Sequence, residues 1–253
     1  MKKSKKLNPF ILLVAAAVLL LASTVGSARA ALTYYSENYV AGVTISNIGI
    51  KLMENGKEIS RRNYIEEDEW DETRGYLFTG HFPTEDSLVL GKKYPEALAV
   101  NNGGTIDTYV KAIVKKSWKD AEGVKNTALS PELIDLHLVT GSNGWVIDEE
   151  ASTAERTVLY YTEILPAGVT TPAFTDTLRI DPAVASKMTE TVEVEVKDGK
   201  EYKTIRYEYE YDGYIFDVEV EADAVQTHNA VDAIKSAWGI DVILNSDGSI
   251  SLK

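Results

Sequence analysis

Short segments in which apolar and polar side chains alternate recur along most of this chain, and most of them end in residues that favour turns. In a β-strand successive side chains point to opposite faces, so this alternation is typical of strands with one buried face. The strand-helix-strand alternation that a parallel sheet requires is missing. The pattern predicts an all-β fold, and we expect an antiparallel β-sandwich with jelly-roll rather than immunoglobulin-like connections.

The expected strands are rich in β-branched and aromatic residues, and they cover residues 43–53, 87–100, 107–118, 145–147, 156–165, 173–180, 191–197, 202–211, 214–221, 241–244 and 250–252. Turns are expected at Asn55-Gly56 and at residues 247–248. The Asp-Gly pairs at 198–199 and 212–213 are typical of type I′ hairpins, which predicts a three-stranded meander over residues 191–221. Adjacent Tyr160 and Tyr161 are expected on opposite faces of one sheet.

Two segments favour helix. Apolar residues recur at helical spacing from residue 227 to Trp238 and are followed by Gly239, with Thr227 as the expected cap. Ser130 precedes Pro131, the order typical of an N-cap and a first helical residue, so one short helical turn is expected there. We therefore expect one short helix near the C-terminus of an otherwise β-rich chain.

The first thirty residues have the layout of a cleavable secretory signal peptide. Four lysines between positions 2 and 6 precede an apolar run over residues 10–22. That run is about thirteen residues, whereas a membrane-spanning helix needs about twenty, so a permanent membrane anchor is the weaker alternative. Ala28 and Ala30 provide small residues at the spacing that a signal peptidase accepts, which predicts cleavage before Ala31.

The secreted product is expected to be strongly acidic. Removing residues 1–30 takes away five cations and no acids, which leaves 21 cationic residues against 39 acidic ones, a charge of −18. Such a surface repels nucleic acids and anionic lipids, so neither is an expected partner. The chain has no cysteine, which excludes disulfides, thiolate catalysis and Cys-ligated zinc. Residues 31–253 are expected to form one β-sandwich domain with an acidic insertion near 58–84.

No motif in the sequence predicts catalysis. His81, His137 and His228 match no zinc-binding spacing, and neither a Gly-x-Ser-x-Gly elbow nor a phosphate-binding glycine loop is present. We therefore expect no catalytic residue, metal ligand or cofactor. The acidic run over residues 66–72 is expected to be a solvated loop, with a calcium site as the alternative because carboxylate oxygens are hard ligands.

Several segments carry a family resemblance. They are the junction over residues 28–36, the strand over 42–52, the stretch over 102–112, Trp145, the Tyr160-Tyr161 pair, and residues 222–226 with the helix that ends at Trp238. These segments resemble the exported proteins processed by a SipW-type signal peptidase, the family of the TasA biofilm matrix proteins and the camelysins. The resemblance covers most of the mature chain and is most specific at the signal junction and around Gln226.

The resemblance implies a jelly-roll β-sandwich exported to the cell surface or matrix. In proteins of the TasA type, subunits polymerise by donating an N-terminal strand to a neighbour, a role that would fall here to Ala31, Leu32, Thr33, Tyr34 and Tyr35. The alternative is that these residues form a first strand of their own domain or stay disordered. The implied partners are the SipW-type peptidase, further copies of the chain and other matrix proteins.

Three functions follow as expectations. The leading one is a secreted, non-enzymatic structural subunit or surface protein of the extracellular or biofilm matrix. The second is a secreted metallopeptidase of camelysin type, although the chain offers no zinc motif to support it. The third is a host- or glycan-binding adhesin, in which Trp70, Trp118 or Trp145 would stack on a ligand.

Overall fold

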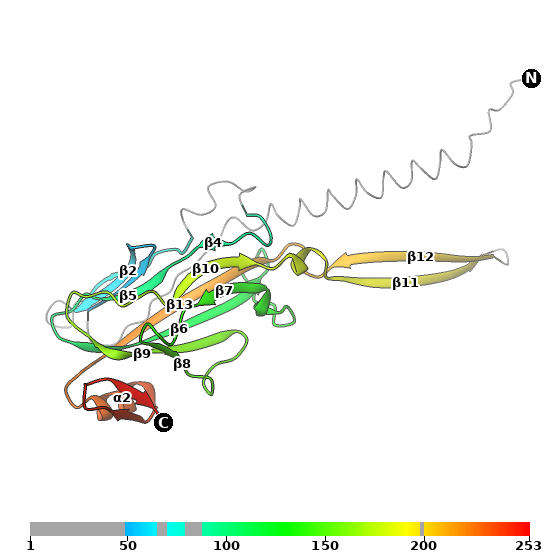
Figure 1. Ribbon diagram of the computed structural model, residues 1–253. Helices are drawn as coiled ribbons and strands as arrows, with labels where there is room; N and C mark the ends of the chain where they lie inside the picture. The colour runs from blue at the N-terminus through cyan, green and yellow to red at the C-terminus, as the bar shows by residue number, and fades with distance from the viewer. Residues whose placement is uncertain (1–48, 65–69, 79–87, 198–199) are drawn as a thin grey trace, which may run out of the picture.

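The computed structural model describes residues 49–64, 70–78, 88–197 and 200–253 (Figure 1). Nearly all of their regular structure is antiparallel β-sheet. The strands are β1 (Ile50–Glu54), β2 (Lys57–Tyr64), β3 (Trp70–Thr73), β4 (Tyr94–Pro95), β5 (Leu98–Asn102), β6 (Thr108–Lys119), β7 (Ile134–Leu138), β8 (Trp145–Ile147), β9 (Arg156–Leu165), β10 (Thr175–Ile180), β11 (Met188–Lys197), β12 (Lys200–Tyr209), β13 (Ile215–Gln226), β14 (Val242–Leu244) and β15 (Ile250–Leu252). The helices are the α-helix α2 (Ala230–Trp238) and two short 3₁₀ helices, η2 (Pro131–Leu133) and η3 (Pro182–Ala185).

One layer of the body is the sheet with strand order β13-β6-β9-β8. Its two longest strands, β13 and β6, pair without a break from Ile215↔Lys119 to Gln226↔Thr108. On its inner face Val114 and Trp118 of β6 lie in the same buried cluster as Phe216 of β13. This is the alternation that the sequence predicts, since every second side chain of each strand enters the core.

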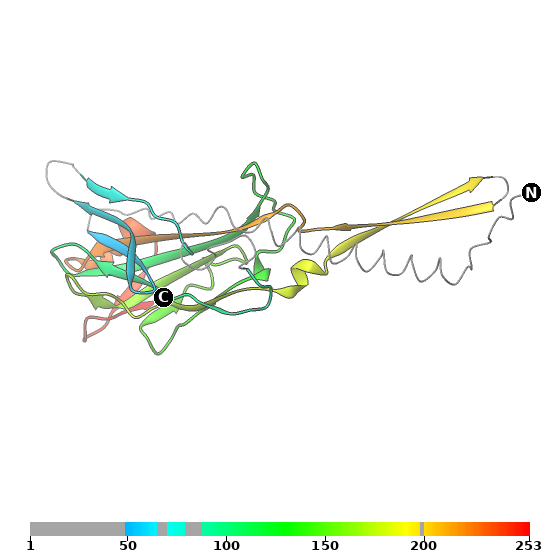
Figure 2. The same ribbon diagram turned by 90° about the horizontal axis from the view of Figure 1, so that it is seen from above.

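The facing layer combines the sheets β3-β2-β1-β5 and β4-β10-β7. Backbone hydrogen bonds join the two sheets: the Phe174 N–H donates to the Leu98 carbonyl at 2.8 Å and the Glu96 N–H to the Asp176 carbonyl at 2.7 Å. Buried residues of both layers form a single main cluster between them. Figures 1 and 2 show the backbone of the body that these sheets form. The prediction of a mostly β, antiparallel fold is confirmed at this level.

The outer face of the β13-β6-β9-β8 sheet is covered by the C-terminal segment. Ile234 of α2, Val242 of β14 and Ile250 of β15 pack with Tyr109 in a second buried cluster. Tyr160 packs on this outer side against Trp238, whereas Tyr161 faces the main core beside Trp145. The predicted opposite orientation of the two tyrosines is therefore confirmed.

Several local predictions are confirmed. Asn55 and Gly56 both have positive φ, at 49° and 80°, as a type I′ turn between β1 and β2 requires. The Ser130 hydroxyl caps η2 by accepting the Glu132 N–H. Helix α2 ends at Gly239, whose φ is 75°, but its N-cap is Asn229 and not the expected Thr227.

The predicted three-stranded meander over residues 191–221 is confirmed for its first two strands, since β11 pairs with β12, but it is wrong for the third. Strand β13 pairs with β6 and not with β12, and in Figure 1 the chain runs on from β12 into the body. Of the Asp212-Gly213 pair only Gly213 has a positive φ, at 77°, whereas a type I′ hairpin needs it at both residues. The other Asp-Gly pair, at 198–199, lies outside the described residues.

The polar stretch near 58–84, expected as an acidic insertion, contains two strands of a sheet. Strand β3 pairs with β2 from Arg61↔Thr73 to Tyr64↔Trp70. Opposite charges face each other across the two strands, since Arg61 binds Asp71 at 2.6 Å. Such cross-strand pairs stabilise strands whose residues are mostly polar, which explains why alternation did not predict these strands.

Candidate assembly surface

Strands β11 and β12 form a two-stranded ribbon that we call the arm. Their pairing is unbroken from Met188↔Tyr209 to Lys197↔Lys200, and they form a sheet of their own. Figures 1 and 2 both show the arm extending away from the body. Among the residues that the structure describes, neither arm strand pairs with a third strand, so both edges of the ribbon lack a described neighbour.

One face of the arm carries exposed apolar side chains near its base. Val192 and Ile205 are cross-strand partners and are 41% and 45% exposed, and Met188 on the same face is 43% exposed. None of the three belongs to a buried hydrophobic cluster of the body. Because a two-stranded hairpin alone is marginally stable in water, a ribbon of this length gains stability from any partner that covers it.

The core holds the base of the arm. Tyr211, which follows β12, is 2% exposed and its ring packs edge-on against Trp118 with ring centroids 4.9 Å apart. The Tyr211 hydroxyl accepts the Ser130 N–H at 3.0 Å, and the Trp118 Nε1–H donates to the Ser130 carbonyl at 2.8 Å. The point from which the arm leaves the body is thus fixed by buried aromatic residues.

Strand β13 provides a second candidate edge. It lies at one end of its sheet, and within the described residues its only hydrogen-bonded neighbour is β6. By contrast, β5 at the end of another sheet is bound by the segment before β10, since the Thr171 N–H donates to the Val100 carbonyl at 2.8 Å. A long sheet edge is a template for adding another strand.

Two buried carboxyl groups lie where β1 meets the start of β5. Glu54 is 8% exposed and accepts the Phe78 N–H at 2.5 Å, and Glu96 is fully buried and accepts from Asn55 Nδ2 at 3.3 Å. Burial, then the charge of Glu54 and a hydrogen bond with it, raise the pKa of Glu96 to about 9. Glu96 is therefore protonated at neutral pH, and because it is buried it has no route to a substrate.

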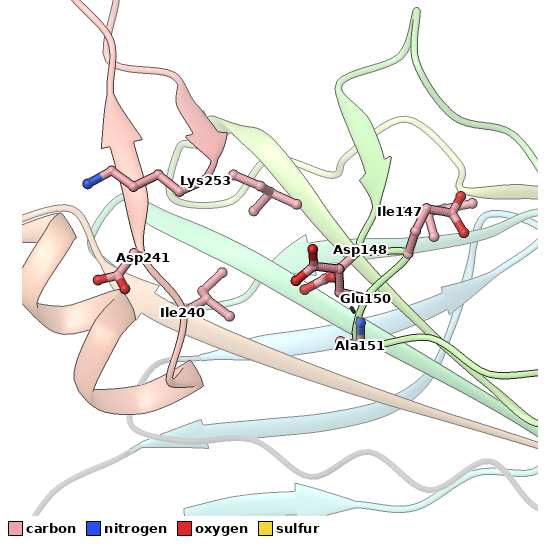
Figure 3. A pocket seen from close by; sticks show the side chains of 9 residues that line it. Ile147, Asp148, Glu150, Ala151, Ile240, Asp241 and Lys253 are labelled. Carbon is pink, nitrogen blue, oxygen red and sulfur yellow. Dashed lines mark hydrogen bonds between the residues drawn. The ribbon is translucent and has the colours of Figure 1, made fainter.

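An open pocket of about 660 Å³ lies between the turn after β8 and the C-terminal hairpin (Figure 3). Apolar Ile240 and Leu252 line it together with the carboxylates of Asp148 and Asp241. Both acids have local partners: Asp148 accepts the Ala151 N–H at 3.0 Å, and Asp241 binds Lys235 at 2.7 Å. The hydrogen bond from Lys235 lowers the pKa of Asp241, so this carboxylate is ionised and engaged.

The histidines form no described metal or catalytic group. His137 Nδ1 lies 2.8 Å from Asp176 Oδ1, and both side chains are exposed. His81 lies outside the described residues. Within the described part of the chain, no three side chains of the His, Asp and Glu types gather so that they could hold a metal ion.

The residues predicted for processing and assembly lie outside the described residues, so their roles remain predictions. These residues are Ala28, Ala30 and Ala31 to Tyr35. The same holds for residues 65–69 of the candidate calcium run. Its last two acids bind arginines: Asp71 binds Arg61, and Glu72 lies 3.6 Å from Arg62.

Two of the tryptophans considered for ligand stacking are buried. Trp118 and Trp145 have no exposed surface, and Trp145 Nε1–H donates to the Pro172 carbonyl at 2.9 Å. Neither ring can stack on a ligand in this fold.

The sequence did not predict the arm as a separate feature. The alternation in its two strands predicts that the strands exist but not that they extend away from the body.

No helix within the described ranges has the length and apolar character needed to span a membrane. Comparison of the chain with protein-family models, with curated proteins and with solved structures finds no match.

Proposed function

We propose that this chain is a secreted, non-enzymatic structural subunit of an extracellular or biofilm matrix, and that copies of it assemble by β-strand addition. The arm is the observation that carries this proposal. The arm has two edges without a described neighbour and exposed apolar side chains, so it adds little to the core of its own subunit. Its geometry suits contact with another chain, because backbone hydrogen bonds at an edge and burial of Val192 and Ile205 both favour association.

In the proposed assembly, Ala31 to Tyr35 are freed by a SipW-type signal peptidase and pair with a sheet edge of the next subunit. Five residues of strand extend about 17 Å, which is shorter than any arm strand and shorter than β13. Jelly-roll connectivity of the two layers is part of the same proposal. No cofactor is required, and calcium at residues 66–72 is retained as an addition to be tested.

The test compares mature protein that begins at Ala31 with a version that lacks residues 31–36. We expect filaments in negative-stain images and fast-sedimenting species only from the complete mature protein, because the shorter one has lost the donated strand. A matched version in which residues 31–36 are replaced by a Gly-Ser segment of equal length separates strand pairing from mere chain length. If all three versions remain monomeric over concentration, pH and millimolar calcium, assembly by strand addition is wrong.

A further inference from the structure

The outer face of the β6-β13 pair carries a row of lysine-carboxylate pairs. Each lysine belongs to β6 and each acid to β13, so every pair crosses between the two strands. The pairs are Lys111 with Asp223 at 2.6 Å, Lys115 with Glu221, and Lys119 with Asp217 at 2.7 Å.

The pair nearest the arm differs from the other two in its burial. The Asp217 side chain is 4% exposed, whereas those of Asp223 and Glu221 are 21% and 26% exposed. Lys119 Nζ also has a second carboxylate, since Glu219 Oε1 lies 3.2 Å away. An amine, a buried carboxyl group and a second carboxylate that can accept and return protons therefore meet at one point.

We propose that Lys119 and Asp217 form an intramolecular amide bond, with Glu219 as the group that moves the protons. The neutral Lys119 amine attacks Asp217 Cγ and forms the C–N bond. One Cγ–O bond then breaks, and the oxygen leaves as water with the proton that Asp217 carried and one proton from the amine. Glu219 transfers the amine proton to the leaving oxygen and ends unchanged. The net reaction is loss of one water molecule, and no oxidant or cofactor takes part.

The surroundings favour the neutral form of Asp217 but the charged form of Lys119, so the amine must first give up a proton. Burial raises the pKa of Asp217 and outweighs the opposite effect of Lys119. For Lys119, burial acts to lower the pKa, but hydrogen bonds with Asp217 and Glu219 outweigh it, so the amine is protonated until it gives a proton to one of them. Groups held in contact react as though at an effective concentration of about 10⁵–10⁸ M, which compensates for a small fraction of the reactive form.

The cross-link would tie β13, an edge strand, to the centre of its sheet close to the base of the arm. The chain has no cysteine, so no disulfide can provide this constraint. A subunit that transmits load through the arm would otherwise rely on non-covalent contacts alone to keep β13 attached.

The test is the intact mass of the folded, purified mature protein measured under denaturing conditions. We expect a mass lower by one water than the sequence requires, and a proteolytic digest should give a branched peptide that joins Lys119 to Asp217. A wild-type mass equal to the full mass calculated from the sequence would overturn the proposal. This measurement needs no variant.

Variants identify the bond. Lys119→Arg keeps the positive charge but cannot form the amide, so it should restore the full mass, as should Asp217→Ala; Glu219→Gln should slow or abolish the loss. The control Asp223→Asn alters the more exposed pair and should keep the cross-link. The chain has Asp-Gly pairs, which can also lose water as cyclic imides, so a mass loss that persists in Lys119→Arg and Asp217→Ala would overturn the proposal.

Discussion

At the scale of single residues, Glu96 has the most unusual environment among the described ionisable groups. Its backbone is fixed on both sides, because the Glu96 N–H donates to Asp176 and the neighbouring Ala97 N–H donates to Asn55 Oδ1 at 2.9 Å. The side chain is consequently held in the interior beside Glu54, where one proton prevents two buried negative charges from facing each other.

This arrangement makes stability depend on pH in a defined direction. The pKa of Glu96 rises from 4.5 to about 9 on folding, so between these values the folded state holds a proton that the unfolded state has lost. Its contribution is fully present below pH 4.5 and is lost as the pH rises to about 9, by up to about 1.4 kcal/mol per pH unit.

Glu96→Gln removes this dependence, because the amide has the shape of the protonated acid and cannot ionise. We expect the variant to gain on wild type in unfolding free energy as the pH rises from 4.5 to 8, by up to about 1.4 kcal/mol per pH unit, with no gain near pH 4.5. Urea unfolding of both proteins across this pH range measures it. Glu58→Gln, at an exposed carboxylate that binds Lys51 and Arg61, is the control and should not flatten the profile. Parallel profiles for Glu96→Gln and wild type would contradict the assignment.

At the scale of elements, the arm and β13 show how local and long-range preferences differ. Both arm strands and β13 alternate in the same way, and Asp-Gly pairs follow β11 and β12 alike. Strand β13 nevertheless leaves the arm, because pairing with β6 places Phe216 and Val218 in the main core. Burial of apolar surface is worth about 25 cal/mol per Å², and a position beside β12 would leave those side chains in solvent.

The proposed role of the arm predicts a separation between assembly and stability. Replacing both Val192 and Ile205 with lysine adds charge to the exposed face, so we expect assembly to weaken severely. The unfolding free energy of the body should change by less than about 0.5 kcal/mol, as is usual for exposed positions. Sedimentation velocity and urea unfolding measure the two effects. Ile243→Lys, at a position 50% exposed on β14 of the C-terminal segment, is the matched control and should assemble like wild type.

At the scale of the whole molecule, charge opposes association. The mature chain is expected to carry 39 acidic residues against 21 cationic ones, so copies repel one another at long range. Any assembly must therefore arise from short-range pairing and apolar contact. These interactions are much less sensitive to salt than repulsion between surface charges.

Assembly should accordingly increase with ionic strength. The screening length falls from roughly 30 Å at about 0.01 M salt to roughly 3 Å at about 1 M, which removes most of the repulsion between subunits. Light scattering of the mature protein at both salt concentrations measures the effect, with the arm variant as the control for non-specific precipitation. Assembly that weakens as salt is added would indicate charge-driven contacts and contradict a strand-based interface.

The sequence by itself determined the features that depend on neighbours along the chain. These include the strands at 145–147 and 156–165, the Asn55-Gly56 turn, the cap at Ser130 and the end of α2 at Gly239. Each is set by backbone conformation or by hydrogen bonds within a few residues, so local residue types are sufficient to predict it.

Only the tertiary structure decided which strands pair, which segment leaves the body and which charged groups become buried. Alternation predicts that a strand has an apolar face but not which surface covers that face. The pairing of β13 with β6 could therefore not be predicted from the sequence. In the same way, Glu96 and Asp217 resemble the other acids in sequence, and they differ only because strands far apart in the chain enclose them. The burial of a charged group and the choice of a strand's partner are properties of the packed molecule. Both depend on residues that lie far apart in the sequence and meet only in the fold.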